Sequence, residues 1–167
     1  MRIEPRRGAF VVGVTEADIG DLCAFRLLVE QRAVRLAAER ADAAGVAALR
    51  EALGRMEEAV DGGRPALMVA PDVQFHRQIV AMSGSRHLQV AWERVSPTIA
   101  TILGINDTSH SNLPQAIAGH RRLLATIASH DPDEAEASMG RHLANSEETI
   151  RAAMRSARAG AIGDAAG

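Results

Sequence analysis

The sequence has no tyrosine, one tryptophan, three phenylalanines and a single cysteine among its 167 residues. One cysteine excludes an internal disulfide, and no apolar run approaches the roughly eighteen residues of a membrane span. The N-terminus lacks the apolar core of a signal peptide, because Glu4 lies among Arg2, Arg6 and Arg7. We therefore expect a cytoplasmic protein that has no membrane partner.

Lysine is also absent, so all 19 basic residues are arginine. Arginine that occurs throughout the chain does not mark one site. The formal net charge of -2 and the isoelectric point near 6.3 argue against a surface that neutralises many phosphates. We do not expect this chain to bind nucleic acid by itself.

Alanine and aliphatic residues must form the interior, and their spacing by three and four favours helices. Thr15 with Asp18 has the spacing of a capping box, and Asp42 is the expected N-cap of the second helix. These residues, together with glycines and prolines, divide the chain into segments joined by short turns. Pro71 predicts that the third segment is kinked or that its helix restarts one residue before Asp72, and Pro97 predicts a bend in the fourth. We predict an all-α, antiparallel bundle of about six helices, at residues 15–41, 42–61, 65–82, 86–103, 114–130 and 132–158.

The two ends of the chain differ from the helical part. Residues 1–14 combine a charged turn with a short β-prone run and are too short to form a domain. Residues 15–158 form the predicted helical domain. Residues 159–167 are small and glycine-rich, and we expect them to be a disordered tail.

Three of the six histidines fall on the apolar stripes of predicted helices. Asp72 and His76 are four residues apart and share one face of the third helix, whereas His120 and His142 lie on the inner faces of the fifth and sixth helices. Buried imidazoles need partners, because an unpaired polar group is costly inside a core. The pattern predicts that Asp72, His76, His120 and His142 bind a metal ion.

Three imidazoles and one carboxylate suit a divalent ion, zinc first, with nickel, cobalt or manganese as alternatives. A 2+ ion with these ligands leaves about one net positive charge in a low-dielectric pocket, which attracts an anion. Coordination positions that the protein leaves open would accept water or an oxygen of an incoming acid.

Each of these residues also has a simpler interpretation. Asp72 follows Pro71 and suits the first turn of a helix, where the helix dipole favours an acidic side chain. His76 or His120, taken singly, is typical of a core histidine that is bonded to a backbone carbonyl. The metal interpretation depends on all four residues together.

Five stretches of the chain carry a resemblance to a known family. They are Phe25–Glu30, Leu36–Arg40, Asp72–His76, Ala118–Ile127 and Met139–Leu143. Over about residues 17–151 the chain resembles the FCD ligand-binding domain of GntR-type transcriptional regulators of the FadR subfamily. In that family the residues that match Asp72, His76, His120 and His142 bind a divalent metal.

The resemblance implies a homodimeric domain that senses a small organic acid or sugar acid and controls DNA binding by a winged helix-turn-helix domain. Arg26 lies in the first matching stretch and is a candidate anchor for the carboxylate of the effector, because guanidinium binds carboxylates bidentately. An ion pair with Glu30 is the alternative role of Arg26. Many relatives have asparagine where this chain has Ser85.

The DNA-reading domain of the family is missing from the chain, and residues 1–14 resemble only the end of its wing and the linker. We expect the chain to be part of a longer regulator that contacts operator DNA only through that domain. The alternative is a natural effector-binding domain that has no DNA-binding domain of its own.

A metal-dependent hydrolase or dioxygenase that uses the same four residues is the competing hypothesis. Such an enzyme needs an acid or base beside the metal, for which only Glu93 or Glu147 could be nominated. Neither an H-E-x-x-H nor an E-x-x-H motif occurs. We therefore expect a regulator and not an enzyme.

Overall fold

The structure, a computed structural model, describes residues 15–105 and 113–164, with side chains described for 15–104 and 113–155. The predicted wing remnant at 1–14 lies outside these residues. The elements are the helices α1 (Glu16–Glu39), α2 (Ala43–Asp61), α3 (Val69–Met82), α4 (Arg86–Ile105), α5 (Leu113–Ala128) and α6 (Pro132–Asp164), and the 3-10 turn η1 (Pro65–Met68). No strand occurs among the described residues, and the expected all-α bundle is confirmed.

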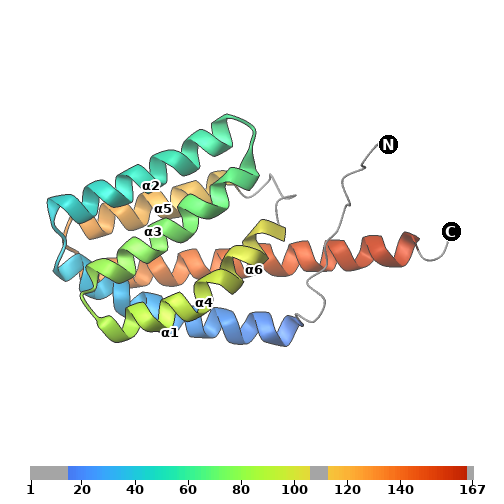
Figure 1. Cartoon of the computed structure of the whole chain (residues 1–167), viewed down its shortest axis with the longest axis horizontal. Helices are drawn as coiled ribbons and strands as arrows, with labels where there is room; N and C mark the ends of the chain where they lie inside the picture. Colours follow the sequence, from blue (N-terminus) through green and yellow to red (C-terminus); the bar gives the residue numbers. More distant parts are fainter. Residues whose placement is uncertain (1–14, 106–112, 165–167) are drawn as a thin grey trace.

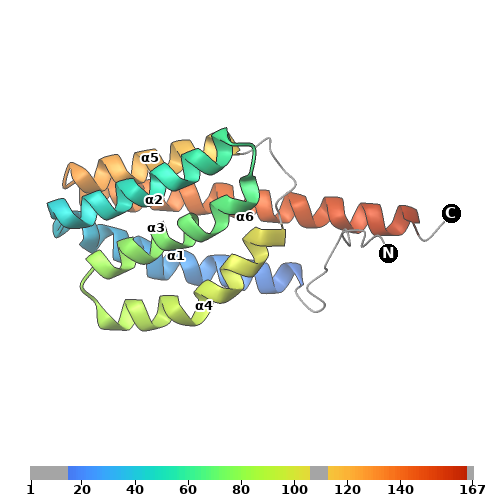
Figure 2. The ribbon, with the colours of Figure 1, turned by 45° about the horizontal axis from the view of Figure 1, so that its top comes forward.

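The helices form a bundle in which distant parts of the sequence lie side by side (Figure 1). The first helix, α1, packs along α6 and also contacts α3, while α2 covers α3 and α5. Helix α4 lies beside α3 and α1 at one edge of the bundle in both views (Figure 2). The interior between α3, α5 and α6 is therefore enclosed by neighbouring helices.

The first two helices begin where the sequence predicts. The Oγ1 of Thr15 accepts a hydrogen bond from the backbone N–H of Asp18, and the Asp18 carboxylate accepts one from the N–H of Thr15, which completes a capping box. Asp42 caps α2 by accepting from the N–H of Gly45 at 2.7 Å. These bonds satisfy N–H groups that have no partner within the helix.

Two boundaries differ from the prediction. The third segment is divided into η1 and α3 at Val69, two residues before Pro71, and Pro71 then lies in the first turn of α3, where its missing N–H costs no helical hydrogen bond. The sixth helix continues to Asp164, so the tail expected at 159–167 is helical over its first part.

The turn between α3 and α4 is ordered by serine hydroxyls. Gly84 has a φ of 66°, a left-handed conformation that favours glycine, and the Arg40 side chain donates to the carbonyl of Ser83. The Oγ of Ser85 accepts from the N–H of Leu88 at 3.4 Å, and the N–H of Ser85 donates to the Oγ of Ser83 at 3.1 Å. Ser85 thus helps to cap α4.

The core is aliphatic apart from Phe75 and Trp92, both of which are fully buried. Helix α4 contains Pro97, as expected, and changes direction along its length (Figure 2). No helix among the described residues has the length and apolar character to span a membrane.

Candidate metal centre

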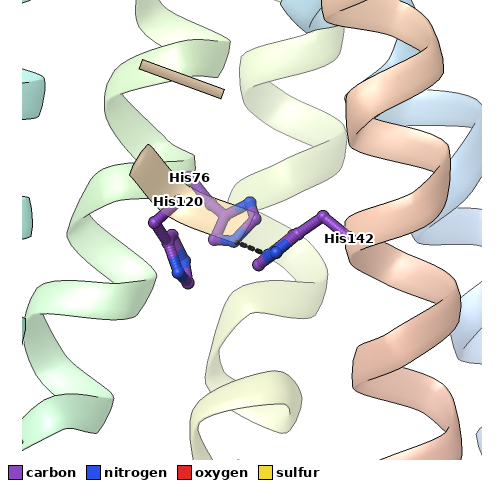
Figure 3. A group of neighbouring side chains, drawn as sticks. All are labelled: His76, His120 and His142. Atoms are coloured by element: carbon purple, nitrogen blue, oxygen red, sulfur yellow. Dashed lines mark hydrogen bonds between the residues drawn. The ribbon is translucent and has the colours of Figure 1, made fainter. Parts of the chain in front are cut away.

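The bundle brings the three predicted histidines together. His76 on α3, His120 on α5 and His142 on α6 are all buried, and a ring nitrogen from each lies within 4.8 Å of the other two. Their rings point toward one another (Figure 3). Asp72 lies one turn before His76 on α3, and its Oδ1 is 3.0 Å from Nε2 of His120. The three histidines therefore form one cluster, and Asp72 adjoins it through its contact with His120.

The environment of His120 fixes the direction of its lone pair. Nδ1 lies 2.8 Å from the carbonyl oxygen of Ala116, which only accepts hydrogen bonds, so Nδ1 carries a proton. Nε2 is therefore the nitrogen that faces the Asp72 carboxylate, and it has no hydrogen-bond partner of good geometry among the described residues. In a neutral ring this nitrogen carries the lone pair, which is available to a metal ion.

His76 and His142 form a second close pair. Their Nε2 atoms are 3.1 Å apart, and the rings stack with centroids 5.1 Å apart. The His142 ring also lies against Gly119, where a Cβ would come within 2.8 Å of Nδ1. Glycine before His120 therefore leaves the space that the His142 ring occupies.

Charge and burial set the protonation states. Burial by itself would raise the pKa of Asp72, but close contact with His120, with His76 and His142 nearby, holds that pKa well below its usual range. Burial, reinforced by the neighbouring histidines, lowers the pKa of the His142 ring. At neutral pH the centre thus presents an ionised carboxylate and a neutral His142 imidazole, the forms that bind a metal ion.

Arg26 and Glu30 reach this centre from α1. Nε of Arg26 lies 2.7 Å from Oε1 of Glu30, and both side chains are buried, so the predicted ion pair is present. Burial by itself would raise the pKa of Glu30, but the charge of Arg26 and contact with His76 lower it. The other carboxylate oxygen, Oε2, is 2.5 Å from Nδ1 of His76.

Sequence reasoning missed this second contact of Glu30. The spacing of Arg26 and Glu30 is visible in the sequence, whereas the approach of α1 to α3 is not. It also missed two aromatic neighbours: Phe75, which meets His120 edge-on with centroids 5.0 Å apart, and Trp92, which stacks on His76 at 5.9 Å.

A cavity of about 140 Å³ opens beside the four residues, and Arg26 lines it as well. Part of its wall is apolar and includes Met68, Leu103, Leu113 and Ile150. Side chains with hydroxyl or amide groups, Gln115, Asn145, Ser146 and Thr149, line another part. The cavity therefore joins the candidate ligands, a guanidinium group and an apolar wall.

The structure also bears on the simpler interpretations. Asp72 does lie in the first turn of α3, and Nδ1 of His120 does bond to a backbone carbonyl. However, Oδ1 of Asp72 and Nε2 of His120 also lie 3.0 Å from each other, beside the histidine cluster. Glu93 and Glu147, the acids nominated for catalysis, form ion pairs with Arg77 and Arg151 and do not line the cavity.

Residues 21–145 match the FCD domain family. The chain is 24% identical over 137 residues to an uncharacterized HTH-type transcriptional regulator, YdhC, of Bacillus subtilis (strain 168), a match that covers 81% of this chain and 61% of YdhC. It is 31% identical over 128 residues to the HTH-type transcriptional repressor NanR of Edwardsiella tarda (strain FL6-60), covering 71% of this chain and 46% of NanR. The chain thus spans about half to three fifths of these curated relatives.

A solved structure of a GntR-family transcriptional regulator from Pseudomonas syringae pv. tomato has the same fold, with a TM-score of 0.73 and 22% identity over 95% of this chain and 66% of that one. These relatives are named as transcriptional regulators, the class of protein that the sequence predicts. The chain belongs to the FCD domain family, and the curated relatives that it matches are named as transcriptional regulators.

Proposed function

We propose that the chain is the effector-sensing and dimerisation domain of a GntR-type regulator, and that it binds a divalent metal and a small organic acid at the four-residue centre. The observation that carries this proposal is the convergence of three buried histidine side chains, whose ring nitrogens lie within 4.8 Å of one another, with the Asp72 carboxylate 3.0 Å from Nε2 of His120. A cation at this place would give these buried polar atoms a common partner.

Asp72, His76, His120 and His142 would hold the ion, with zinc as the first choice and nickel, cobalt or manganese as alternatives. The ion would supply a positive charge and open coordination positions for an oxygen of the effector. The Ala116 carbonyl and the packing of Phe75 against His120 hold that ring in the orientation that coordination requires.

The effector would lie in the adjoining cavity. A volume of about 140 Å³ fits a molecule of roughly six to ten non-hydrogen atoms, because a cavity of similar size in another protein accepts benzene. Arg26 uses Nε for Glu30, and its remaining N–H groups form no hydrogen bond to any residue that the structure describes. These groups are suited to hold the carboxylate of a small organic or sugar acid.

The sensing domain would act on DNA through a winged helix-turn-helix domain outside this sequence, in the cytoplasm. The names of YdhC and NanR as HTH-type regulators support separate sensing and DNA-binding domains. Effector control requires two arrangements of the domain that differ in affinity for the acid.

A thermal-shift screen tests the sensing function. We expect zinc to raise the melting temperature, and we expect at least one small carboxylic or sugar acid to raise it further only when zinc is present, because the acid needs both the ion and Arg26. The same screen on an Arg26→Met variant should lose the response to the acid. If no acid adds to the effect of zinc, the metal has a structural role only and the sensor proposal is wrong.

A second copy of the chain is the proposed partner of the α1 and α4 surface. Phe25 and Leu28 on α1 and Val90 on α4 are exposed to 37%, 74% and 51%, on two helices that lie side by side (Figure 1). Large exposed apolar side chains on neighbouring helices are typical of a protein interface.

Leu28→Asp should therefore weaken dimerisation at least about tenfold, because it places a charge in an apolar interface. Sedimentation velocity over a range of protein concentrations measures the effect. Leu67→Asp is the matched control, since Leu67 is 54% exposed but lies on η1, away from α1 and α4. A wild-type protein that stays monomeric, or two variants that behave alike, would contradict this interface.

A further inference from the structure

We infer that Glu30 is a positioning residue that fixes the tautomer of His76, and that Arg26 in turn holds Glu30 in place. This inference rests on the proposed function, because it concerns how the chain prepares one candidate ligand for a metal ion. The three side chains form a continuous path from α1 to the centre on α3.

The contacts along this path are short and buried. The carboxylate of Glu30 uses its two oxygens for different partners: Oε1 is 2.7 Å from Nε of Arg26, and Oε2 is 2.5 Å from Nδ1 of His76. The side chains of Glu30 and His76 are each 1% exposed, and that of Arg26 is 4% exposed. Because a buried carboxylate is costly without partners, both contacts stabilise its position.

The contact with Glu30 determines which nitrogen of His76 carries the proton. Lone pairs on Nδ1 and on a carboxylate oxygen would repel at 2.5 Å, so a proton lies between them, although the alignment is poor for a linear hydrogen bond. In a neutral His76 ring, Nδ1 is then the protonated nitrogen and Nε2 keeps its lone pair. That lone pair faces Nε2 of His142 at 3.1 Å, inside the candidate centre.

Arg26 and Trp92 limit the movement of Glu30 and His76. Arg26 binds Glu30 through Nε, and its guanidinium carbon lies 5.9 Å from the centroid of the Trp92 ring. The same indole ring stacks on His76. The positive charge of Arg26 also balances that of Glu30, so Glu30 does not by itself add a net negative charge to the cluster.

Glu30→Gln tests the role of the carboxylate. An amide can present its NH₂ group to Nδ1 of His76, which favours a proton on Nε2 and removes the lone pair from the centre. We expect the affinity for zinc, measured by competition with a chromogenic chelator, to fall about 10- to 100-fold, the usual effect of losing a partner that orients a ligand. Glu30→Asp, which keeps the carboxylate, should recover part of the loss.

The imidazole ¹⁵N chemical shifts of metal-free protein report the tautomer directly, with the His76 signals assigned from a His76→Gln variant. We expect the Nδ1–H form in the wild type and loss of this form in Glu30→Gln. Glu39→Gln, a change on the exposed part of the same helix, should alter neither the shifts nor the zinc affinity.

Two results would overturn the inference: an Nε2–H tautomer of His76 in the wild type, or zinc affinity of folded Glu30→Gln within about twofold of the wild type. The first needs no variant, so it decides the question even if Glu30→Gln does not fold. A wild type with the Nδ1–H tautomer that binds no zinc would support the Glu30 contact and contradict the proposed metal centre.

Discussion

Asp72→Ala and His142→Ala are each expected to lower the affinity for zinc more than about 100-fold. The physical reason is that each variant removes a side chain that faces the centre directly, whereas losing an outer partner costs about 10- to 100-fold. Asp72→Ala also removes the negative charge that lies 3.0 Å from His120, and His142→Ala leaves Nε2 of His76 without its neighbour at 3.1 Å.

Metal content after dialysis against zinc measures these losses, and the fluorescence of Trp92 provides a second readout. Trp92 is the only tryptophan of the chain, and its ring stacks on His76, so occupation of the centre should change its emission. Asp133→Ala and His87→Ala are matched controls, since both residues are exposed. Zinc retention equal to that of the wild type in Asp72→Ala and His142→Ala would contradict the assignment of the site.

Phe75→Ala should lower the free energy of unfolding of the metal-free protein by about 3–5 kcal/mol. Phe75 is fully buried, and its ring meets His120 and His76 edge-on with centroids 5.0 and 6.1 Å apart. The substitution therefore removes a large apolar side chain and leaves a cavity beneath two of the candidate ligands. Because the rings lose support, the affinity for zinc should fall as well.

Urea unfolding in the presence of a chelator, at one protein concentration, measures the change in stability. Phe75→Leu is the control, because it keeps much of the apolar volume and should lose less than half as much. A loss below about 1 kcal/mol in Phe75→Ala would show that the ring does not support the centre as the structure indicates.

The sequence determined the helices and most of their ends. Thr15 with Asp18 and Asp42 cap the first two helices as expected, since capping depends on side chains within three residues of the helix start. The boundaries that failed depend on weak local preferences: the division at Val69 before Pro71, and the extension of α6 to Asp164. Local sequence does not determine how far a marginal helix continues.

The sequence also identified the four candidate ligands, because helical periodicity places Asp72 and His76 on one face and puts His120 and His142 on inner faces. It could not show which nitrogen of each ring faces the centre. That depends on the Ala116 carbonyl for His120 and on Glu30 for His76, and the second of these contacts joins α1 to α3. Only tertiary packing brings together residues that are far apart in the chain, so the contact of Glu30 with His76, the histidine cluster and the cavity beside Arg26 were decided by the fold and not by any local pattern.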